Sequence, residues 1–170
     1  MIYSGHEFFD AVQQEIGRDL PIIVEDLGDM TEEIFHLRDK FNLTGIRILQ
    51  FGFGFYPDNI YRVHNYIPNS VAYTGTHDNP PVLGWWREHA TDGEKRNFIE
   101  YIKRPEVYDG HENEHDHINW MINHLNHHIH WYLIQMALTS VSNIAIIQFQ
   151  DFLGLDNHSR MNNPALGKFI

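Results

Sequence analysis

Four short apolar runs, separated by longer segments with helical spacing, place the strongest limit on how this chain can fold. The runs are LPIIVE at 20–25, GIRILQF at 45–51, SVAYT at 70–74 and NIAIIQF at 143–149. They are rich in β-branched residues and do not alternate cleanly between apolar and polar positions, which is typical of strands covered on both faces. We therefore predict four strands of a parallel sheet.

The segments around these runs carry apolar residues at helical intervals. Helices are predicted over 7–16, from Thr31 onward, over about 82–89, about 92–103 and about 117–138. The predicted apolar faces are Phe8, Val12 and Ile16 in the first helix, Ile34, Leu37 and Phe41 in the second, and Ile118, Met121, Ile122, Leu125, Ile129, Leu133 and Met136 in the longest. The polar stretch 104–116 is predicted to be a surface loop or a disordered insertion.

Strands that alternate with helices indicate an α/β fold with a parallel sheet. Four strands cannot close a barrel of eight, and the chain starts with a helix instead of a strand. The arrangement therefore indicates half of a larger fold.

The charge balance narrows the class of partner. Asp and Glu number 23 against 12 Lys and Arg, so the formal net charge is −11. A field of this sign repels nucleic-acid phosphates and anionic lipids but not a neutral substrate. No apolar run is long enough for a membrane span, and the first residues do not resemble a signal peptide. The sequence contains no cysteine. We expect a cytoplasmic protein that binds neither nucleic acids nor membranes.

Polar residues follow the carboxyl end of each predicted strand. They are Glu25-Asp26, Gln50, His77-Asp78-Asn79 and Gln150-Asp151. In parallel α/β folds these ends converge on one edge, where reactive groups gather. Two converging carboxylates suit glycosidic bond chemistry, in which one acts as an acid and the other attacks or stabilises the sugar cation. Structural ion pairs would also explain carboxylates at these positions.

Glu25 and Asp78 are the candidates for this pair. Glu25 follows an apolar strand that would keep its carboxyl group in a low-dielectric environment, which raises the pKa of a carboxyl group as a general acid requires. Asp78 lies between His77 and Asn79, two donors that would hold it ionised.

Seven motifs in a fixed order resemble one known family. They are PIIVEDLG (21–28), GIRILQFGF (45–53), HNY (64–66), NSVAYTGTHDN (69–79), GWW (84–86), QDFLGL (150–155) and RMN (160–162). Their succession is similar to the C-terminal part of the catalytic barrel of amylomaltases, the 4-α-glucanotransferases of glycoside hydrolase family 77 that include the plant disproportionating enzyme.

The resemblance implies that residues 1–170 form one partial catalytic domain, the C-terminal half of a (β/α)8 TIM barrel. It also implies a retaining double-displacement transferase that moves α-1,4-glucan segments between maltooligosaccharides without a cofactor or metal. It assigns the general acid/base to Glu25, transition-state stabilisation to Asp78 and sugar binding at the cleavage site to His77. It further points to Phe53 near the acceptor sugars and to Asn162 as a sugar contact. The family's nucleophile is an Asp in an R-I-D-H motif, which has no counterpart in these residues. We therefore expect this chain to be inactive alone.

Several alternatives remain open from the sequence. The chain could be a non-catalytic carbohydrate-binding or assembly module derived from the family. Thirteen histidines, with His124 and His128 four apart on the long helix, could indicate a metal site, although solvated histidines are the more ordinary explanation. The GFGF stretch at 52–55 lacks the partners of a phosphate loop. Trp85 and Trp86 could form a sugar platform or belong to the core.

A partial barrel also has a physical consequence. Its sheet would have two unpaired edges and an uncovered apolar face. We therefore expect the isolated chain to self-associate through those edges, or to be poorly stable.

Overall fold

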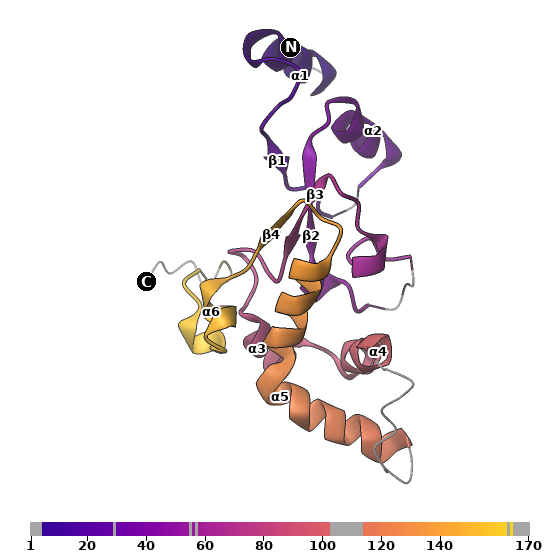
Figure 1. Ribbon diagram of the computed structural model, residues 1–170, viewed down its shortest axis with the longest axis vertical. Helices are drawn as coiled ribbons and strands as arrows, with labels where there is room; N and C mark the ends of the chain where they lie inside the picture. Colours follow the sequence, from indigo (N-terminus) through magenta and orange to yellow (C-terminus); the bar gives the residue numbers. More distant parts are fainter. Residues whose placement is uncertain are drawn as a thin grey trace.

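A parallel four-stranded sheet forms the centre of the molecule (Figure 1). The computed structural model describes residues 5–28, 30–54, 56, 58–102, 114–162 and 164. The strands are β1 (Ile23–Val24), β2 (Thr44–Ile48), β3 (Ser70–Tyr73) and β4 (Ile144–Ile146). They lie in the order β1-β2-β3-β4, and every neighbouring pair is parallel. The four predicted strands and their parallel arrangement are confirmed.

The strands are shorter than the apolar runs that predicted them. After β2, residues Leu49–Phe51 turn into a 3-10 helix, and after β4 the chain enters the short helix α6 (Phe149–Phe152). In both places the backbone leaves the sheet where its side chains become polar. The polar side chains at these ends therefore project from turns instead of from extended strand.

The remaining helices match the predicted ones closely. They are α1 (Gly5–Ile16), α2 (Glu32–Lys40), α3 (Val82–Gly84), which runs into a π-helical turn at Trp85–His89, α4 (Asp92–Ile102) and α5 (Glu114–Thr139). Because α5 begins at Glu114, the last residues of the predicted loop 104–116 are helical, while 103–113 lie outside the described residues. Among the helices that the structure describes, none combines the length and apolarity needed to cross a membrane.

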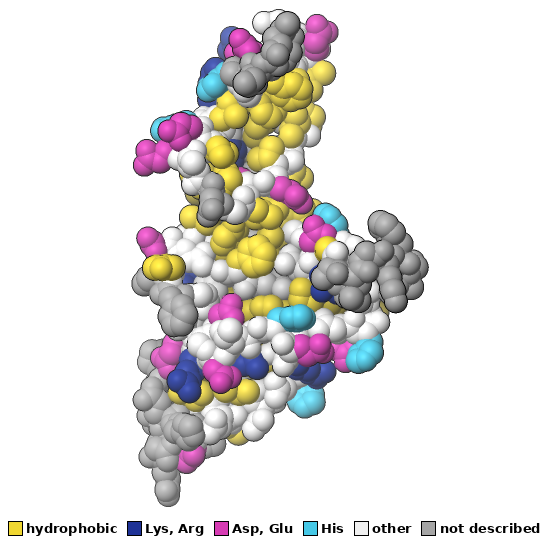
Figure 2. All heavy atoms as spheres, turned by 180° about the vertical axis from the view of Figure 1, so that it is seen from behind, with side chains coloured by type: hydrophobic (Ala, Val, Ile, Leu, Met, Phe, Trp, Pro, Cys, Tyr) yellow, Lys and Arg dark blue, Asp and Glu magenta, His cyan; other side chains and the backbone are white. Residues whose placement is uncertain are grey.

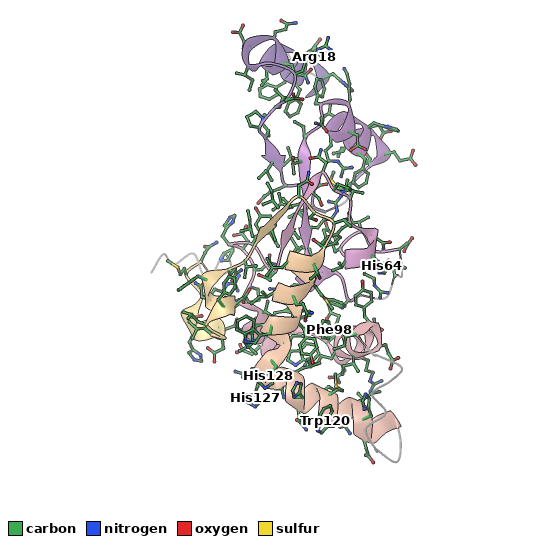
Figure 3. All side chains as sticks on the ribbon, viewed as in Figure 1. Arg18, His64, Phe98, Trp120, His127 and His128 are labelled. Carbon is green, nitrogen blue, oxygen red and sulfur yellow. The ribbon has the colours of Figure 1, made fainter. Side chains whose placement is uncertain are left out.

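The main hydrophobic core lies between α5 and the adjoining parts of the sheet. All seven apolar residues predicted on the long helix belong to this core or pack against it. Trp86 and Phe98, the latter labelled on α4 in Figure 3, are fully buried here, and Trp85 is 6% exposed. Neither tryptophan therefore offers a surface for a sugar ring.

A second, smaller core joins α1 and α2 at one end of the molecule (Figure 1). Phe9 of α1 packs against Phe41, with 5.3 Å between the ring centroids, and Val12 and Leu37 lie beside them. The apolar faces predicted for these helices are partly wrong, because Phe8, Ile16 and Ile34 are exposed. In α1 the contact uses Phe9 in place of the predicted Phe8, together with the predicted Val12.

The sheet face opposite α5 is partly uncovered. Ala72 and Ala145 pack with the α5 core, and adjacent strand residues point to opposite faces, so Tyr73, Ile144 and Ile146 project the other way. Both isoleucines are exposed. Figure 2, the view from behind, shows hydrophobic side chains gathered over the middle of the molecule. In the part of the chain that the structure describes, this face has no second layer across β4.

Candidate active site

The loop that follows β3 brings three of the predicted site residues together. Nδ2 of Asn162 donates to Oδ1 of Asp78 at 2.8 Å and to the backbone oxygen of His77 at 3.2 Å. Nε2 of His77 lies 3.5 Å from Oδ2 of Asp78. Arg160 donates through Nη2 to the backbone oxygen of Asp78 at 2.6 Å. The C-terminal segment therefore orients the loop that carries the candidate carboxylate.

This cluster faces a solvent-accessible pocket. The side chains of His77 and Asp78 are 71% and 57% exposed. A cavity of about 370 Å³ beside them is lined by Tyr73, Gly75, His77, Gln148, Arg160 and Asn162, among others. The lining combines apolar side chains, such as Ile146 and Met161, with polar ones, and this mixture suits an uncharged ligand that carries hydroxyl groups.

Asn79 does not act as predicted. Its Oδ1 accepts hydrogen bonds from the backbone nitrogen of Thr76 at 2.9 Å and from the Thr76 hydroxyl at 2.8 Å. Its amide thus closes the turn of the loop, and the donors next to Asp78 are Asn162 and, when its Nε2 carries a proton, His77. Asn79 is therefore not a donor to Asp78, and the role of His77 as a donor to Asp78 stays a prediction, with Nε2 of His77 3.5 Å from the carboxylate.

Glu25 lies on the same face of the sheet as this pocket. Val24 pairs with Gly45, which places Glu25 level with Ile46 on the face away from α5. Burial, and after it the negative charge of Glu25, raises the pKa of Tyr73, a residue that lines the pocket. The strand register places Glu25 on the sheet face that carries the pocket, and its effect on Tyr73 agrees with that placement.

The environment of Glu25 differs from the one predicted. Its side chain is exposed, whereas the apolar run before it predicted a low-dielectric enclosure. The reason is that β1 has two residues and pairs with β2 on one side, so no described strand covers its outer edge. The shielding expected of a general acid is absent from the described part of the chain.

The next residue, Asp26, is deeply buried and points the other way. Its Oδ2 accepts from Nη1 of Arg38 at 2.7 Å and from Nη1 of Arg47 at 3.0 Å, and its Oδ1 accepts from the backbone nitrogen of Ile46 at 2.7 Å. A Cβ atom on Gly45 would collide with this carboxylate. Burial acts to lower the pKa of Arg38, but hydrogen bonds to Asp26 and Asp39 raise it overall. This ion cluster fastens β1 to β2 and α2 directly beside Glu25.

Phe53 is not brought to the site. It is 1% exposed, and its ring packs edge-on against Phe98 with 4.7 Å between centroids. The backbone oxygen of Phe53 accepts from Nδ2 of Asn97 at 3.0 Å, which fixes the loop to α4. The prediction that Phe53 lies near the acceptor sugars is not supported by its position, because its side chain belongs to the core. Gly52 donates its amide to the backbone oxygen of Leu49 at 3.0 Å, as in a turn, and not toward a phosphate site.

The histidines of α5 form a row of ring contacts. His124 stacks on Trp120 with 5.5 Å between centroids, and His124 and His128 are 4.7 Å apart. Figure 3 shows Trp120, His127 and His128 along this helix. Burial, helped by His128 and Arg87, lowers the pKa of His130. Within the described ranges, no group of three or more His, Cys, Asp or Glu side chains is placed to hold a metal ion.

Four residues of the site received no role from the sequence. Gln50, Gln148 and Asp151 hold the loop after β3, and Arg160 binds the backbone of Asp78. Gln50 and Asp151 were visible as polar residues at strand ends, and Arg160 belongs to the RMN motif. Gln148 lies inside an apolar run, and this polar interruption was the available signal.

Comparison with known proteins gives a consistent family. The sequence profile of the 4-α-glucanotransferase family, glycoside hydrolase family 77, matches residues 1–168. The 4-α-glucanotransferase of Synechocystis is 38% identical over 161 residues, which cover 94% of this chain and 28% of the relative. The chloroplastic/amyloplastic 4-α-glucanotransferase of Oryza sativa is 39% identical over 161 residues, covering 95% and 24%.

A solved structure agrees with the sequence relatives. The amylomaltase from Streptococcus agalactiae in complex with acarbose superposes with a TM-score of 0.74 at 30% identity, covering 96% of this chain and 29% of the amylomaltase. The chain thus spans about a quarter of the length of the relatives it matches. From the family profile, the relatives and the shared fold together, the chain belongs to the 4-α-glucanotransferase family.

Proposed function

We propose that this chain carries part of the active site of a 4-α-glucanotransferase that moves α-1,4-glucan segments between maltooligosaccharides with retention of configuration. The observation that carries the proposal is the cluster of Asp78, His77 and Asn162 at an open pocket, with Glu25 on the same sheet face. The acarbose complex of the amylomaltase neighbour supports an α-glucan as the ligand class.

The two carboxylates would have different roles. Glu25 would protonate the glycosidic oxygen of the donor and later take a proton from the acceptor hydroxyl. Asp78 would place its negative charge beside the sugar carbon as that carbon becomes cationic. Asn162 holds one oxygen of Asp78 at 2.8 Å and leaves the other toward His77, so the carboxylate is oriented before a sugar arrives. His77 would donate a hydrogen bond to a sugar hydroxyl.

A double displacement also needs a carboxylate nucleophile. The sequence contains no R-I-D motif, and we assign neither Glu25 nor Asp78 to that role. We therefore propose that the chain binds sugar and supplies the acid/base and the stabilising carboxylate, while transfer requires a nucleophile from outside these 170 residues.

The test separates binding from transfer. The chain is titrated with acarbose while its amide NMR signals are followed, and it is separately incubated with maltotriose. We expect shifts at His77, Asp78 and Asn162 and no redistribution of maltotriose into glucose and longer chains. Asp78→Asn should weaken the shifts, whereas Asp10→Ala on the distant helix α1 should not. Clear transfer by the chain alone would contradict the missing nucleophile, and an absence of shifts at these residues would contradict the site.

The competing proposal, a non-catalytic carbohydrate-binding module, gives a different result in one further measurement. Addition of the remaining barrel as a separate polypeptide should restore maltotriose transfer if these residues are catalytic. Sugar binding that persists without any transfer after reconstitution would favour the binding module. Glu25→Gln in the reconstituted enzyme is the matched control, because it should abolish transfer while binding remains.

Two further expectations accompany the proposal. The cytoplasmic location stays a prediction, since the rice relative is named as chloroplastic/amyloplastic. Self-association also stays a prediction: β1 and β4 each pair on one side among the described strands, and Ile144 and Ile146 are exposed on β4. Light scattering that shows a monomer at high concentration would contradict self-association.

A further inference from the structure

A single buried carboxylate closes the loop that carries the candidate site. Oδ2 of Asp151 accepts from the hydroxyl of Thr74 at 2.6 Å, and its Oδ1 accepts from the backbone nitrogen of Val82 at 2.7 Å. Thr74 is the residue after β3, and Val82 is the first residue of α3. Asp151 has no exposed surface. The seven residues between its two partners, 75–81, include His77 and Asp78.

Two amide side chains hold the same loop further along. Nε2 of Gln148 donates to the backbone oxygen of Thr76 at 2.6 Å, and Nε2 of Gln50 donates to that of Pro80 at 2.9 Å. Both amides crowd Gly75, where an added Cβ would lie 2.6 Å from Gln50 and 3.1 Å from Gln148. The loop is thus fixed at its ends by Asp151 and at its flanks by residues that follow β2 and β4.

Asp151 does not touch the reactive carboxylate itself. The described partners of the Asp78 side chain are Asn162 and His77. The direction in which Asp78 points consequently depends on the course of the loop backbone, and that course begins and ends at groups bound to Asp151. The carboxylate of Asp151 accepts from both partners, because the backbone N–H of Val82 is a donor and the hydroxyl of Thr74 donates to it here.

We propose that Asp151 is a positioning residue for glucan transfer, which sets the approach of Asp78 to the sugar by fastening both ends of the 75–81 loop. The inference rests on the proposed function, yet the fastening of the loop stands on geometry alone. A carboxylate buried without solvent is tolerated here because both of its oxygens receive hydrogen bonds.

Asparagine provides a conservative test of this geometry. In Asp151→Asn, the amide oxygen still accepts from Val82, and the amide nitrogen donates to the Thr74 hydroxyl, which then acts as an acceptor. Asp151→Ala loses both bonds. Asparagine at position 151 therefore keeps a hydrogen bond to both Thr74 and Val82, whereas alanine removes both. Thr74→Val removes one of the two bonds without changing the side-chain volume much, and it supplies a milder variant if the alanine protein does not fold.

The first measurement does not depend on activity. Hydrogen exchange of the backbone amides of the loop and of Val82 is followed by NMR in each variant. We expect Asp151→Ala to accelerate exchange at Val82 and at Thr76–Asn79 at least tenfold, Thr74→Val to do so less, and Asp151→Asn to stay within about threefold of the unmodified chain. Exchange that is unchanged in Asp151→Ala, or accelerated equally over the whole chain, would overturn the proposal.

The second measurement uses the complete enzyme that contains these residues, with maltotriose as substrate. We expect Asp151→Ala to lower kcat at least thirtyfold with KM changed less than threefold, and Asp151→Asn to restore kcat to within about fivefold. A merely structural role predicts instead an activity proportional to the folded fraction, with no separation of kcat from KM, and that result would overturn the positioning role. If the unmodified enzyme transfers no glucan but hydrogen exchange changes as expected, the proposed function is wrong, while the fastening of the 75–81 loop by Asp151 is still supported.

Discussion

The two candidate carboxylates are held by different means, although both follow strands of the same sheet. Glu25 directly follows the two-residue edge strand β1, and the carboxylate of its neighbour Asp26 is held by Arg38, Arg47 and a backbone amide. Asp78 lies in a seven-residue loop after the central strand β3, which is fastened by Asp151, Gln50 and Gln148.

The difference shows two solutions to one problem, which is how to keep an exposed carboxylate in place. At β1 a cluster of full charges joins strand, helix and neighbouring strand, and Glu25 takes its position from the residue beside it. At β3 mostly neutral hydrogen bonds hold a longer loop at several points. The first arrangement is strong but depends on every charge being paired, and the second distributes the restraint over several weaker contacts.

The largest expected effect comes from breaking the charge cluster. Asp26→Ala leaves Arg38 and Arg47 buried without their shared partner, and removal of one member of a buried ion cluster typically lowers the free energy of unfolding by about 3–5 kcal/mol. Chemical denaturation of the chain measures this. Asp39→Ala is the matched control, since that carboxylate also binds Arg38 but is 61% exposed, and its loss should be below about 1 kcal/mol. Equal losses of unfolding free energy in the two variants would remove the distinction between the site held by buried charges at β1 and the site held by several hydrogen bonds at β3.

A smaller effect is expected when the same cluster is crowded instead of broken. In Gly45→Ala the new methyl group meets the carboxylate of Asp26, and overpacking of this kind typically lowers stability by about 1–3 kcal/mol. The matched variant is Ala72→Gly on β3, which removes a methyl group without crowding any charge. If Gly45→Ala proves as stable as the unmodified chain, the close approach of β2 to Asp26 is not a restraint.

The pH dependence sharpens the comparison at Asp151. Burial raises the pKa of Asp151, although hydrogen bonds from Thr74 and Val82 act to lower it. Because its folded pKa is above its unfolded one, its contribution to stability is fully present below the unfolded pKa and is lost as the pH rises through the folded pKa. Relative to Asp151→Asn, the unmodified chain should therefore gain stability as the pH is lowered from neutrality. Thermal unfolding of both proteins across that range checks the sign, and parallel curves would contradict it.

The smallest effects on stability are expected at the candidate catalytic residues themselves. Glu25 and Asp78 are exposed, so Glu25→Gln and Asp78→Asn should each change the free energy of unfolding by no more than about 0.5 kcal/mol. Their effect should appear in sugar binding or transfer instead. A large stability loss in either variant would mean that the residue belongs to the supporting structure and not to the site.

The sequence predicted the sheet and the helices because those depend on local patterns, and motifs in register named Asp78, His77 and Asn162 as candidates without predicting the bond between Asn162 and Asp78. The core face of α5 followed from seven apolar residues at helical spacing. The faces of α1 and α2 followed only in part, since adjacent phenylalanines at 8 and 9 are equally apolar and the choice between them depends on where Phe41 lies.

The contacts that hold the two candidate carboxylates in place could not be predicted from the sequence, for a different reason. Asp26 and Asp151 are carboxylates at strand ends, as Glu25 is, and a sequence pattern does not say which of two neighbouring acids turns inward. That choice is made by Arg38, Arg47, Thr74 and Val82, which come from other elements. Phe53 was assigned to the sugar site by its motif, yet its burial depends on Phe98 from α4.

The bond between Thr74 and Asp151 joins positions that are 77 residues apart. Between them the chain forms α3, α4 and all of α5 before it returns to the sheet as β4. Contacts of such long sequence separation require much chain entropy to be lost before they form, so they slow folding. We therefore expect the loop that carries Asp78 to order late, after the helical core has condensed. During synthesis, residue 151 would have to emerge from the ribosome before the pocket could form.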